Sequence, residues 1–429
     1  MRIGKLKKRD IEIKFDGGDL TSDSGLYLLK MADEKMSLCK RLSKVFPDPR
    51  DQSRVTHSLE SMLKQRVYGL ASGYEDLNDH EVLRKDISFQ TAVGCMSDLA
   101  GDSTLSNFEK WADRNFSWSA HKIFLSAFIE SFDYVPTHLI LDFDGSDSEI
   151  FGNQEHRYYH KYYGSYCYLP LYVYCGNHLL VAYLRPSYRH GSYQAAPILK
   201  LLVKALREKW PGVKISFRGD GGFQKPYLHD WCDRNNVGFI AGLGGNDRLD
   251  KLADRYIKRA EKYYESSEES SKIFGQFLYQ AKTWKKKYKV IVKAEYNDLG
   301  PNTRYVVTNL NGCPEEIYKE KYCPRGDMEN RIQETQRSLF ADRVSAMSFD
   351  GNQFRMILSA AAYIIMNAIR QICFVNEGKK SLRCETIRNQ FLKVAAVITK
   401  NTRRIVFHLP SNYPYKQEFN GIVASLAPT

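Results

Sequence analysis

The pattern of residues 137–243 limits the fold more than any other part of this 429-residue chain. A short apolar run, THLILDFDG, precedes two others, SYCYLPLYVYC and HLLVAYLRP, which Gly176-Asn177 separates as a hairpin turn would. A helix pattern (APILKLLVKALREKW), a strand (KISFRGD), a helix (KPYLHDWCDRNN) and a strand (VGFIAGL) come next. Hairpin-linked strands followed by strand–helix–strand predict an α/β protein with a mixed sheet that helices cover.

The flanking segments differ in pattern and predict further regions. A short alternating strand at residues 10–17 precedes helical periodicity, in which STLSNFEKWADRN starts with a Ser/Thr cap signal. Alternating strands return in FGQFLYQAKTW, KYKVIVKAEY and RYVVTNL, and a long apolar helix follows in FRMILSAAAYIIMNAIRQI. The predicted regions are a helical region (1–130), the first part of a sheet core (131–245), a β-rich insertion (246–317), the last part of the core (318–345) and a C-terminal helical region (346–429).

Charge and composition favour some partners over others. The net charge of +13 favours a polyanion, nucleic acid first. No secretory signal and no run of about 18 apolar residues occurs, so we expect no membrane partner. Nine scattered cysteines without a C-x-x-C pair predict a reducing cytoplasm. Aromatic residues make up 13% of the chain, which suits either stacking on flat partners or a tyrosine-rich core.

Acidic residues stand at three places where chemistry could occur. Asp142 and Asp144 end one apolar strand, Asp220 ends another, and Glu329 lies in a predicted helix. Sites in α/β sheets gather at the carboxyl ends of strands. Two strand-end carboxylates and one on a crossing helix form an oxygen cage suited to Mg²⁺ or Mn²⁺. For any of these acids taken alone, a helix cap or a turn residue is the simpler interpretation.

The combination of motifs is more specific than any single acid. Tyr322-x-x-Arg325-x-x-x-Glu329 resembles the Y-x2-R-x3-E signature of the hairpin-forming branch of DDE transposases, and LDFDGSD and RGDGGF resemble their two aspartate strands. Five separated segments are similar to the "thirteen-eighty" family of insertion-sequence transposases: FDGGDLTSDSGLYLL, DSTLSNFE, GSYCYLPLYVYCG, RGDMENRI and YPYKQEF.

The resemblance implies a ribonuclease-H-like core with a β-rich insertion between the second aspartate and the glutamate. It implies that Asp144, Asp220 and Glu329 are the catalytic carboxylates and hold two divalent ions, Mg²⁺ or Mn²⁺. Asp142 stays open as an alternative first ligand, because residues two apart on a strand share a face. Arg325 and Glu329 are four apart and would pair on a helix, either as a surface ion pair or with Arg325 holding a DNA phosphate and Tyr322 beside it.

This chain departs from the signature at one position. The family has a lysine seven residues after the glutamate, and here that position is Gln336. Glutamine can hydrogen-bond a phosphate but supplies no charge. The adjacent Arg337 points about 100° away on a helix, so the phosphate contact of this position is in doubt.

Further candidates for DNA contact lie outside the signature. Lysines surround Trp284, so Lys285 and Lys286 are predicted to contact the DNA backbone and Trp284 to take up an unstacked base, as the resemblance implies; a core tryptophan is the alternative. In the helical N-terminal region, Arg54, Lys64 and Arg66 are candidates for reading the element ends, although a solvated charged face explains them equally.

The resulting hypothesis is a cut-and-paste DNA transposase acting in the cytoplasm of a bacterium, on its nucleoid. Its expected partners are double-stranded DNA, as terminal inverted repeats and target, and a second copy of the chain in a homodimeric synaptic complex. Two alternatives remain: a nuclease of the same fold that cuts without strand transfer, and an inactive DNA-binding repressor.

Overall fold

The computed structural model describes residues 1–377 and 382–427, which form two compact units built from non-consecutive segments. Unit 1 contains Met1–Ala120, Glu334–Ala341 and Ile357–Thr429, and unit 2 contains His121–Gln333 and Asp342–Met356. The sequence predicted five consecutive regions. The structure instead joins the N-terminal and C-terminal helical regions in unit 1.

Unit 2 is built on an eight-stranded mixed sheet, which agrees with the predicted α/β class. The strand order is β12-β13-β14-β11-β10-β4-β8-β9. Strands β4, β10 and β11 are parallel to one another, and every other neighbouring pair is antiparallel. The predicted turn at Gly176-Asn177 joins β8 to β9. The strands are β4 (His138–Gly145), β8 (Leu171–Cys175), β9 (His178–Tyr183), β10 (Lys214–Gly219), β11 (Gly238–Leu243), β12 (Ser271–Tyr279), β13 (Tyr288–Asn297) and β14 (Gly300–Thr308).

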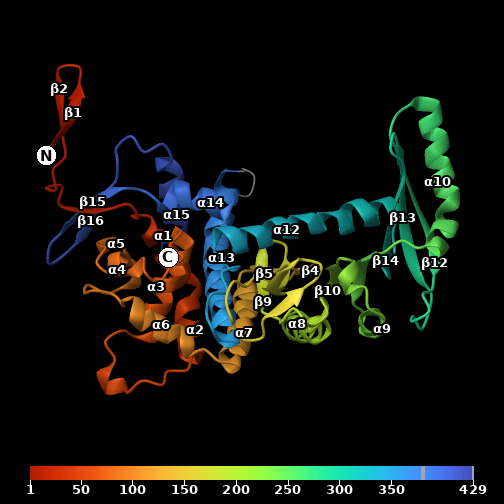
Figure 1. The fold of residues 1–429 in the computed structure, drawn as a ribbon, viewed down its shortest axis with the longest axis horizontal. Coiled ribbons are helices and arrows are strands. Elements are labelled where there is room, and N and C mark those ends of the chain that lie inside the picture. Colours follow the sequence, from red (N-terminus) through yellow and green to blue (C-terminus); the bar gives the residue numbers. More distant parts are fainter. Residues whose placement is uncertain (378–381, 428–429) are drawn as a thin grey trace. The chain divides into compact units, whose positions relative to one another are not determined.

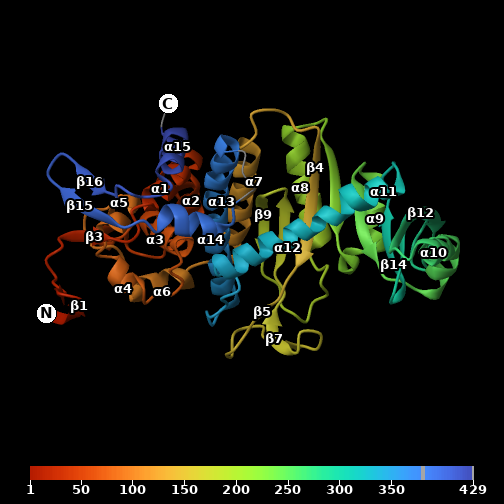
Figure 2. The same cartoon turned by 90° about the horizontal axis from the view of Figure 1, so that it is seen from above.

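Helices cover both faces of this sheet (Figure 1). Helices α8 (Ala195–Lys209) and α9 (Pro226–Arg234) lie on one face, and α12 (Gly326–Gln333) crosses the other, as Figure 2 also shows. Because side chains alternate along a strand, Leu141 and Phe143 enter the core under α8 and α9. Asp142 and Asp144 therefore face the side of α12.

The predicted β-rich insertion is present, but it continues the central sheet rather than forming a separate sheet. Its strands β12 to β14 join the core because β14 pairs with β11, with Gly242 opposite Val306. Helix α10 (Asp247–Ser267) packs on β12 and β13. A small cluster on the α12 side, Ile240, Ile291, Val306, Ile317 and Tyr318, fixes the helical segment that leads to α12.

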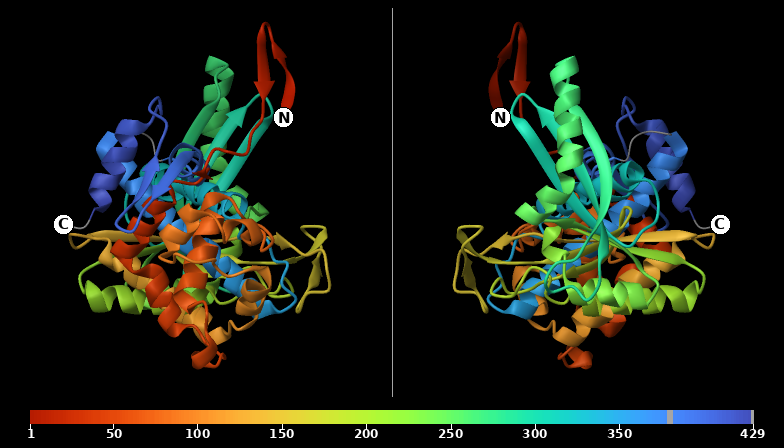
Figure 3. Two further views of the ribbon diagram at one scale, coloured as in Figure 1. Left: turned by 90° about the vertical axis from the view of Figure 1, so that its left-hand side faces the viewer. Right: turned by 90° about the vertical axis from the view of Figure 1, so that its right-hand side faces the viewer.

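A small three-stranded sheet interrupts the chain between β4 and β8. Its strands are β5 (Ser148–Glu149), β6 (Tyr158–His160) and β7 (Ser165–Tyr168), in the order β5-β7-β6. Figure 3 shows this segment, in yellow, projecting from the large sheet of unit 2.

Unit 1 is mainly helical. A three-stranded sheet, β16-β15-β3, pairs Asp19–Thr21 (β3) with Ala396–Lys400 (β15), which in turn pairs with Ile405–His408 (β16). Its helices are α1 (Leu26–Met36), α2 (Leu38–Val45), α3 (Leu59–Ser72), α4 (His80–Leu83), α5 (Ile87–Val93), α6 (Asp102–Lys110), α14 (Cys384–Ile387) and α15 (Lys416–Leu426). Helices α7 (Arg114–Glu130) and α13 (Phe349–Glu377) run through the boundaries of both units.

Several local predictions for unit 1 were wrong. A hairpin of β1 (Arg2–Leu6) and β2 (Arg9–Glu12) replaces the strand expected at 10–17. Helix α6 begins after Gly101, so its N-cap residue is not the expected Ser or Thr and has no capping side chain. Glu109 of this helix pairs with Arg66 at 3.2 Å. Arg66 is therefore buried rather than exposed, because it neutralises a carboxylate inside the unit.

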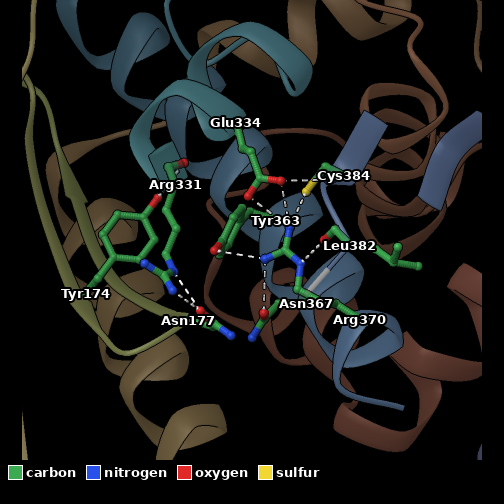
Figure 4. A network of polar contacts seen from close by, with 9 residues as sticks. All are labelled: Tyr174, Asn177, Arg331, Glu334, Tyr363, Asn367, Arg370, Leu382 and Cys384. Carbon is green, nitrogen blue, oxygen red and sulfur yellow. Dashed lines mark hydrogen bonds and ion pairs between the residues drawn. The ribbon is translucent and has the colours of Figure 1, made fainter. Parts of the chain in front are cut away.

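A buried arginine holds three C-terminal segments of unit 1 together (Figure 4). Arg370 on α13 donates from Nη2 to both carboxylate oxygens of Glu334, at 3.0 and 2.9 Å. Glu334 opens the π-helical turn η5 (Glu334–Ser338), and its Oε1 also accepts the backbone N–H of Cys384 at 2.8 Å. Both charges are thus paired and hydrogen-bonded, as burial requires.

Helix α13 is longer than the sequence predicted. Among the described residues, its Phe349–Cys373 stretch alone is long and apolar enough to cross a membrane by length and composition. Within this stretch, 78% of the most apolar 18-residue segment is buried inside the protein. A buried core helix has the same length and apolar composition.

Candidate active site

The two aspartates of β4 have different partners. Asp142 lies opposite Arg218 of β10, whose Nη2 donates to Asp142 Oδ2 at 2.7 Å. Arg218 also donates from Nη1 to the carbonyl of Lys321 at 2.6 Å. Burial raises the pKa of Asp142 although Arg218 opposes the shift. Asp142 therefore occupies a buried ion pair, which fixes the segment before Tyr322.

Asp144 lies with the signature residues instead. Its Oδ1 accepts the N–H of Gly145 at 2.9 Å, and its Oδ2 accepts Nη1 of Arg325 at 2.9 Å. Arg325 Nη2 lies 2.7 Å from Glu329 Oε1. The predicted pairing of Arg325 with Glu329 is present, and Arg325 also joins Glu329 to Asp144. Of the two aspartates left open by the sequence, Asp144 is the one beside Glu329.

Asp220 follows the neighbouring parallel strand β10. Its side chain accepts the N–H of Gly222 at 2.8 Å and so caps the short turn Gly221–Phe223. The turn lies close to β11, because a Cβ on Gly242 would be 3.0 Å from the nitrogen of Gly221 and 2.8 Å from the hydroxyl of Tyr322. A glycine at the end of β11 thus lets Tyr322 approach the Asp220 turn.

The segment carrying Tyr322, Arg325 and Glu329 is one helical run with changing pitch. A π-helical stretch, η3 (Ile317–Tyr322), leads through the 3₁₀ turn η4 (Cys323–Arg325) into α12. Arg331, in the last turn of α12, donates from Nε to Asn177 Oδ1 at 2.7 Å, at the β8–β9 turn (Figure 4). This contact fixes the helix that bears Glu329 against the sheet.

Electrostatics distinguish Asp144 from an ordinary surface acid. Asp144 is 8% exposed, and burial raises its pKa to about 7; Asp220 and Glu329 add to the shift, and Arg325 opposes it. Burial lowers the pKa of Arg325, but Asp144 and Glu329 outweigh burial and raise it above its ordinary value. The site therefore concentrates more negative charge than its arginine neutralises, which is typical of functional sites.

A cavity of about 660 Å³ opens beside these residues. Tyr322, Arg325 and Glu329 line one side, and the glycine-rich end of β11 lines another. The insertion contributes Lys293, Arg304 and Tyr305, which the sequence analysis did not single out. Their strands could be recognised in KYKVIVKAEY and RYVVTNL, but no local pattern in these segments shows that these side chains border the site.

The remaining sequence candidates are not among the residues that line this cavity. Gln336 and Arg337 lie in η5 and belong to unit 1; Gln336 is buried and Arg337 is exposed. Trp284 is 4% exposed and packs against Tyr288 and Tyr279. It is therefore a core tryptophan, the alternative interpretation of the sequence, and its ring is not accessible to a base. Lys285 and Lys286 are exposed and pair with Asp230 at 3.4 Å and Asp233 at 2.6 Å.

No group of three His, Cys, Asp or Glu side chains stands ready to hold a metal ion among residues 1–377 and 382–427. The donor chemistry nevertheless fits a divalent ion. Asp144, Asp220 and Glu329 supply hard oxygen ligands, and the pKa of Asp144 is raised partly by the other two carboxylates. A bound cation would relieve that repulsion.

Acids at the ends of adjacent parallel strands, with a third on a crossing helix, form the kind of arrangement that can support metal-assisted phosphoryl transfer. The model of the family Transposase DDE domain group 1 matches residues 3–429, and the chain belongs to this family. The expected resemblance to DDE transposases is thereby confirmed.

The chain is also similar to proteins of known structure. Seven chains of solved structures match, among them the cryo-EM structure of the piggyBac transposase synaptic complex with hairpin DNA. That chain is 13% identical, with a TM-score of 0.45, over 86% of this chain and 79% of the other. No curated protein matches this chain.

Proposed function

We propose that this protein is the transposase of a bacterial insertion sequence of the "thirteen-eighty" group, which cuts the phosphodiester bonds at the element ends and joins the freed 3′-hydroxyls to target DNA. One observation carries the proposal. In this chain of the transposase DDE family, Arg325 contacts both the buried Asp144 and Glu329, and the charge of Asp220 helps to raise the pKa of Asp144.

The topology supports a ribonuclease-H-like core. The order β9-β8-β4-β10-β11 places three antiparallel neighbours (β9, β8, β4) beside two parallel ones (β10, β11). Asp144 and Asp220 lie at the ends of two adjacent parallel strands, β4 and β10. The strands β12 to β14 then form an insertion that extends the same sheet and borders the cavity.

Asp144, Asp220 and Glu329 would hold two Mg²⁺ or Mn²⁺ ions. Such ions supply Lewis acidity that activates a water or a 3′-hydroxyl and stabilises the leaving oxygen. Because the pKa of Asp144 is about 7, cation binding at neutral pH displaces a proton from part of the molecules. Arg325 orients Asp144 and Glu329, because its Nη1 and Nη2 are directed at these carboxylates. We propose that Arg325 exchanges these carboxylates for a DNA phosphate when substrate binds.

The protein's partners follow from its charge and its two units. Unit 1 would bind the terminal inverted repeats, and Lys285 and Lys286 of unit 2 would contact DNA phosphates. Joining two ends requires both in one complex, so we propose a homodimer at synapsis, in the bacterial cytoplasm.

The test is cleavage of DNA carrying the element ends with Mg²⁺ or Mn²⁺, comparing the wild type with Glu329→Gln and Glu315→Gln. The two glutamates are matched: their side chains are 53% and 52% exposed, and each pairs with a basic residue four positions away, at 2.7 and 2.6 Å. We expect Glu329→Gln to abolish metal-dependent cutting and Glu315→Gln to retain it.

Three other outcomes would redirect the proposal. Cutting that survives Glu329→Gln removes Glu329 from the site. Cutting of ends without joined products, when pre-cut ends and target are supplied, identifies a nuclease. Tight end binding without cutting by the wild type in either metal identifies a repressor.

A further inference from the structure

Six tyrosines crowd one exposed part of unit 2. We call this part the tyrosine lobe, defined as residues 146–170 with the adjoining loop 186–190. Its rings are 39–85% exposed, and they belong to Tyr158, Tyr159, Tyr162, Tyr163, Tyr166 and Tyr188. A cluster of exposed aromatic rings on one surface is uncommon in a protein without a partner there.

The rings touch mainly through their edges and so leave faces open. Tyr159 and Tyr166 lie opposite each other across β6 and β7, with centroids 5.5 Å apart and planes at 74°. At the turn between these strands, Tyr162 and Tyr163 meet at 5.0 Å and 90°. In such T-shaped pairs only one face of one ring is covered by its neighbour. The lobe therefore presents ring faces that the neighbouring tyrosines do not cover.

Cations accompany these faces. The guanidinium of Arg157 lies 4.2 Å from the ring centroid of Tyr166, and that of Arg189 lies 5.4 Å from Tyr188. Lys161 is exposed in the turn next to Tyr162. Aromatic faces that take stacked bases, with basic groups that take phosphates, are the combination found on surfaces that bind single-stranded nucleic acid.

The lobe is anchored beside the candidate active site. Its two ends leave β4 and β8 where Gly145 pairs with Leu171, one residue from the pair of Asp144 and Tyr172. The buried Arg185 holds the base of the lobe by donating to the carbonyls of Leu169 at 2.7 Å and Pro170 at 3.3 Å. The lobe is thus a fixed excursion from the strand that bears Asp144.

We propose that the tyrosine lobe binds unpaired nucleotides of DNA next to the reacting phosphate, with bases stacking on Tyr159, Tyr162 and Tyr166 and phosphates pairing with Arg157 and Lys161. The inference rests on the proposed function for its substrate, DNA, and adds which form of DNA this surface selects. A duplex buries the faces of its bases, so the lobe distinguishes single strands, frayed ends and extruded bases from intact duplex.

The test measures DNA binding by fluorescence anisotropy in EDTA, with a labelled oligothymidine about 20 nucleotides long and a duplex of equal length. One variant of the full chain carries Tyr159→Leu, Tyr162→Leu and Tyr166→Leu (the lobe Leu variant), and a second carries Tyr159→Phe, Tyr162→Phe and Tyr166→Phe (the Phe variant). A matched control carries Tyr134→Leu, Tyr227→Leu and Tyr263→Leu, whose side chains are 73%, 52% and 51% exposed outside the lobe.

We expect the lobe Leu variant to lose at least about tenfold in single-strand affinity, because it removes three rings on which bases stack. The Phe variant keeps its affinity because the rings remain. The control keeps it because its tyrosines lie elsewhere. Duplex affinity changes less than about threefold in every variant, since backbone charge dominates it.

Four results would overturn the proposal: unchanged single-strand binding in the Leu variant, an equal loss in the control, an equal loss in the Phe variant, or an equal loss on duplex. The oligomeric state is measured by light scattering. If the Leu variant is a monomer where the wild type is a dimer, and it still binds oligothymidine normally, the lobe is a contact surface between two copies of the chain, and the proposal is overturned. Failure of the proposed function can be distinguished from failure of the lobe proposal. A wild type that binds single strands through the lobe but cuts no DNA refutes the transposase reaction alone, whereas a cutting enzyme whose Leu variant binds normally refutes the lobe alone.

Discussion

Replacing Asp144 by asparagine is expected to stabilise the protein while abolishing its reaction. Asp144 is 8% exposed and its pKa is about 7, against an ordinary value of 3.8, and burial is the main cause. A tenfold change in an ionisation constant is about 1.4 kcal/mol, so ionising this carboxyl in the folded state costs about 4 kcal/mol more than in the unfolded state. The opposing attraction of Arg325 is already contained in that pKa.

The sign of the pH dependence follows from the raised pKa. The unfolded chain releases this proton near pH 4, whereas the folded chain retains it to about pH 7. The free energy of unfolding contributed by Asp144 therefore falls as the pH rises from about 4 to about 7 and is constant above that range. Asp144→Asn does not lose this free energy, so its free energy of unfolding exceeds that of the wild type by at most about 4 kcal/mol at pH 8. The difference declines steadily below pH 7 and vanishes near pH 4.

The assay is urea unfolding at pH 5, 6, 7 and 8, followed by tryptophan fluorescence in a background carrying Trp111→Phe and Trp118→Phe. The remaining tryptophans, Trp210, Trp231 and Trp284, then all report on unit 2. Asp254→Asn is the control, because Asp254 is an exposed carboxylate of α10 and should change stability by less than about 0.5 kcal/mol. A variant that is no more stable than the wild type at pH 8, or an advantage that does not shrink toward pH 5, would refute the reasoning.

Three other substitutions test the packing described above. Arg370→Leu leaves Glu334 buried without its cation, and Arg218→Met does the same to Asp142; each should lower the free energy of unfolding by about 3–5 kcal/mol in urea. Adding Glu334→Gln or Asp142→Asn, respectively, should recover most of the loss, and failure to recover it would show that the charge is not the cause. Gly275→Ala places a methyl group 2.1 Å from the ring of Tyr256, so thermal unfolding should show a loss of about 1–3 kcal/mol, which Tyr256→Leu relieves. An unchanged melting temperature in Gly275→Ala would contradict this contact.

The sequence predicted the parts of the site that depend on local pattern. Asp144 and Asp220 could be placed together because each ends an apolar strand and neighbouring parallel strands end at one edge. The four-residue spacing of Arg325 and Glu329 predicted their pairing on a helix. The hairpin at Gly176-Asn177 followed from turn chemistry alone.

The remainder depends on contacts that local pattern does not contain. Asp142 and Asp144 have the same sequence environment, and distant arginines separate their roles: Arg218, 76 residues away, pairs with Asp142, and Arg325, 181 residues away, pairs with Asp144. Trp284 is flanked by lysines, yet the aromatic side chains around it bury it. The extension of the central sheet by β14 depends on its pairing with β11, about 60 residues distant in the chain, and no periodicity within β14 encodes that partner.

The pairing of β3 with β15 has a consequence for synthesis of the protein on the ribosome. Leu20 lies opposite Val397, so unit 1 needs residues from both ends of the described chain. All segments of unit 2 have been translated once the ribosome has passed Met356. The N-terminal part of unit 1, in contrast, can be completed only after residues beyond Met356 have been translated. At elongation rates of about 5–20 residues per second, β3 stays without its partner strand β15 for many seconds. A polypeptide terminated soon after Met356 would therefore carry every carboxylate of the candidate site but no completed unit 1.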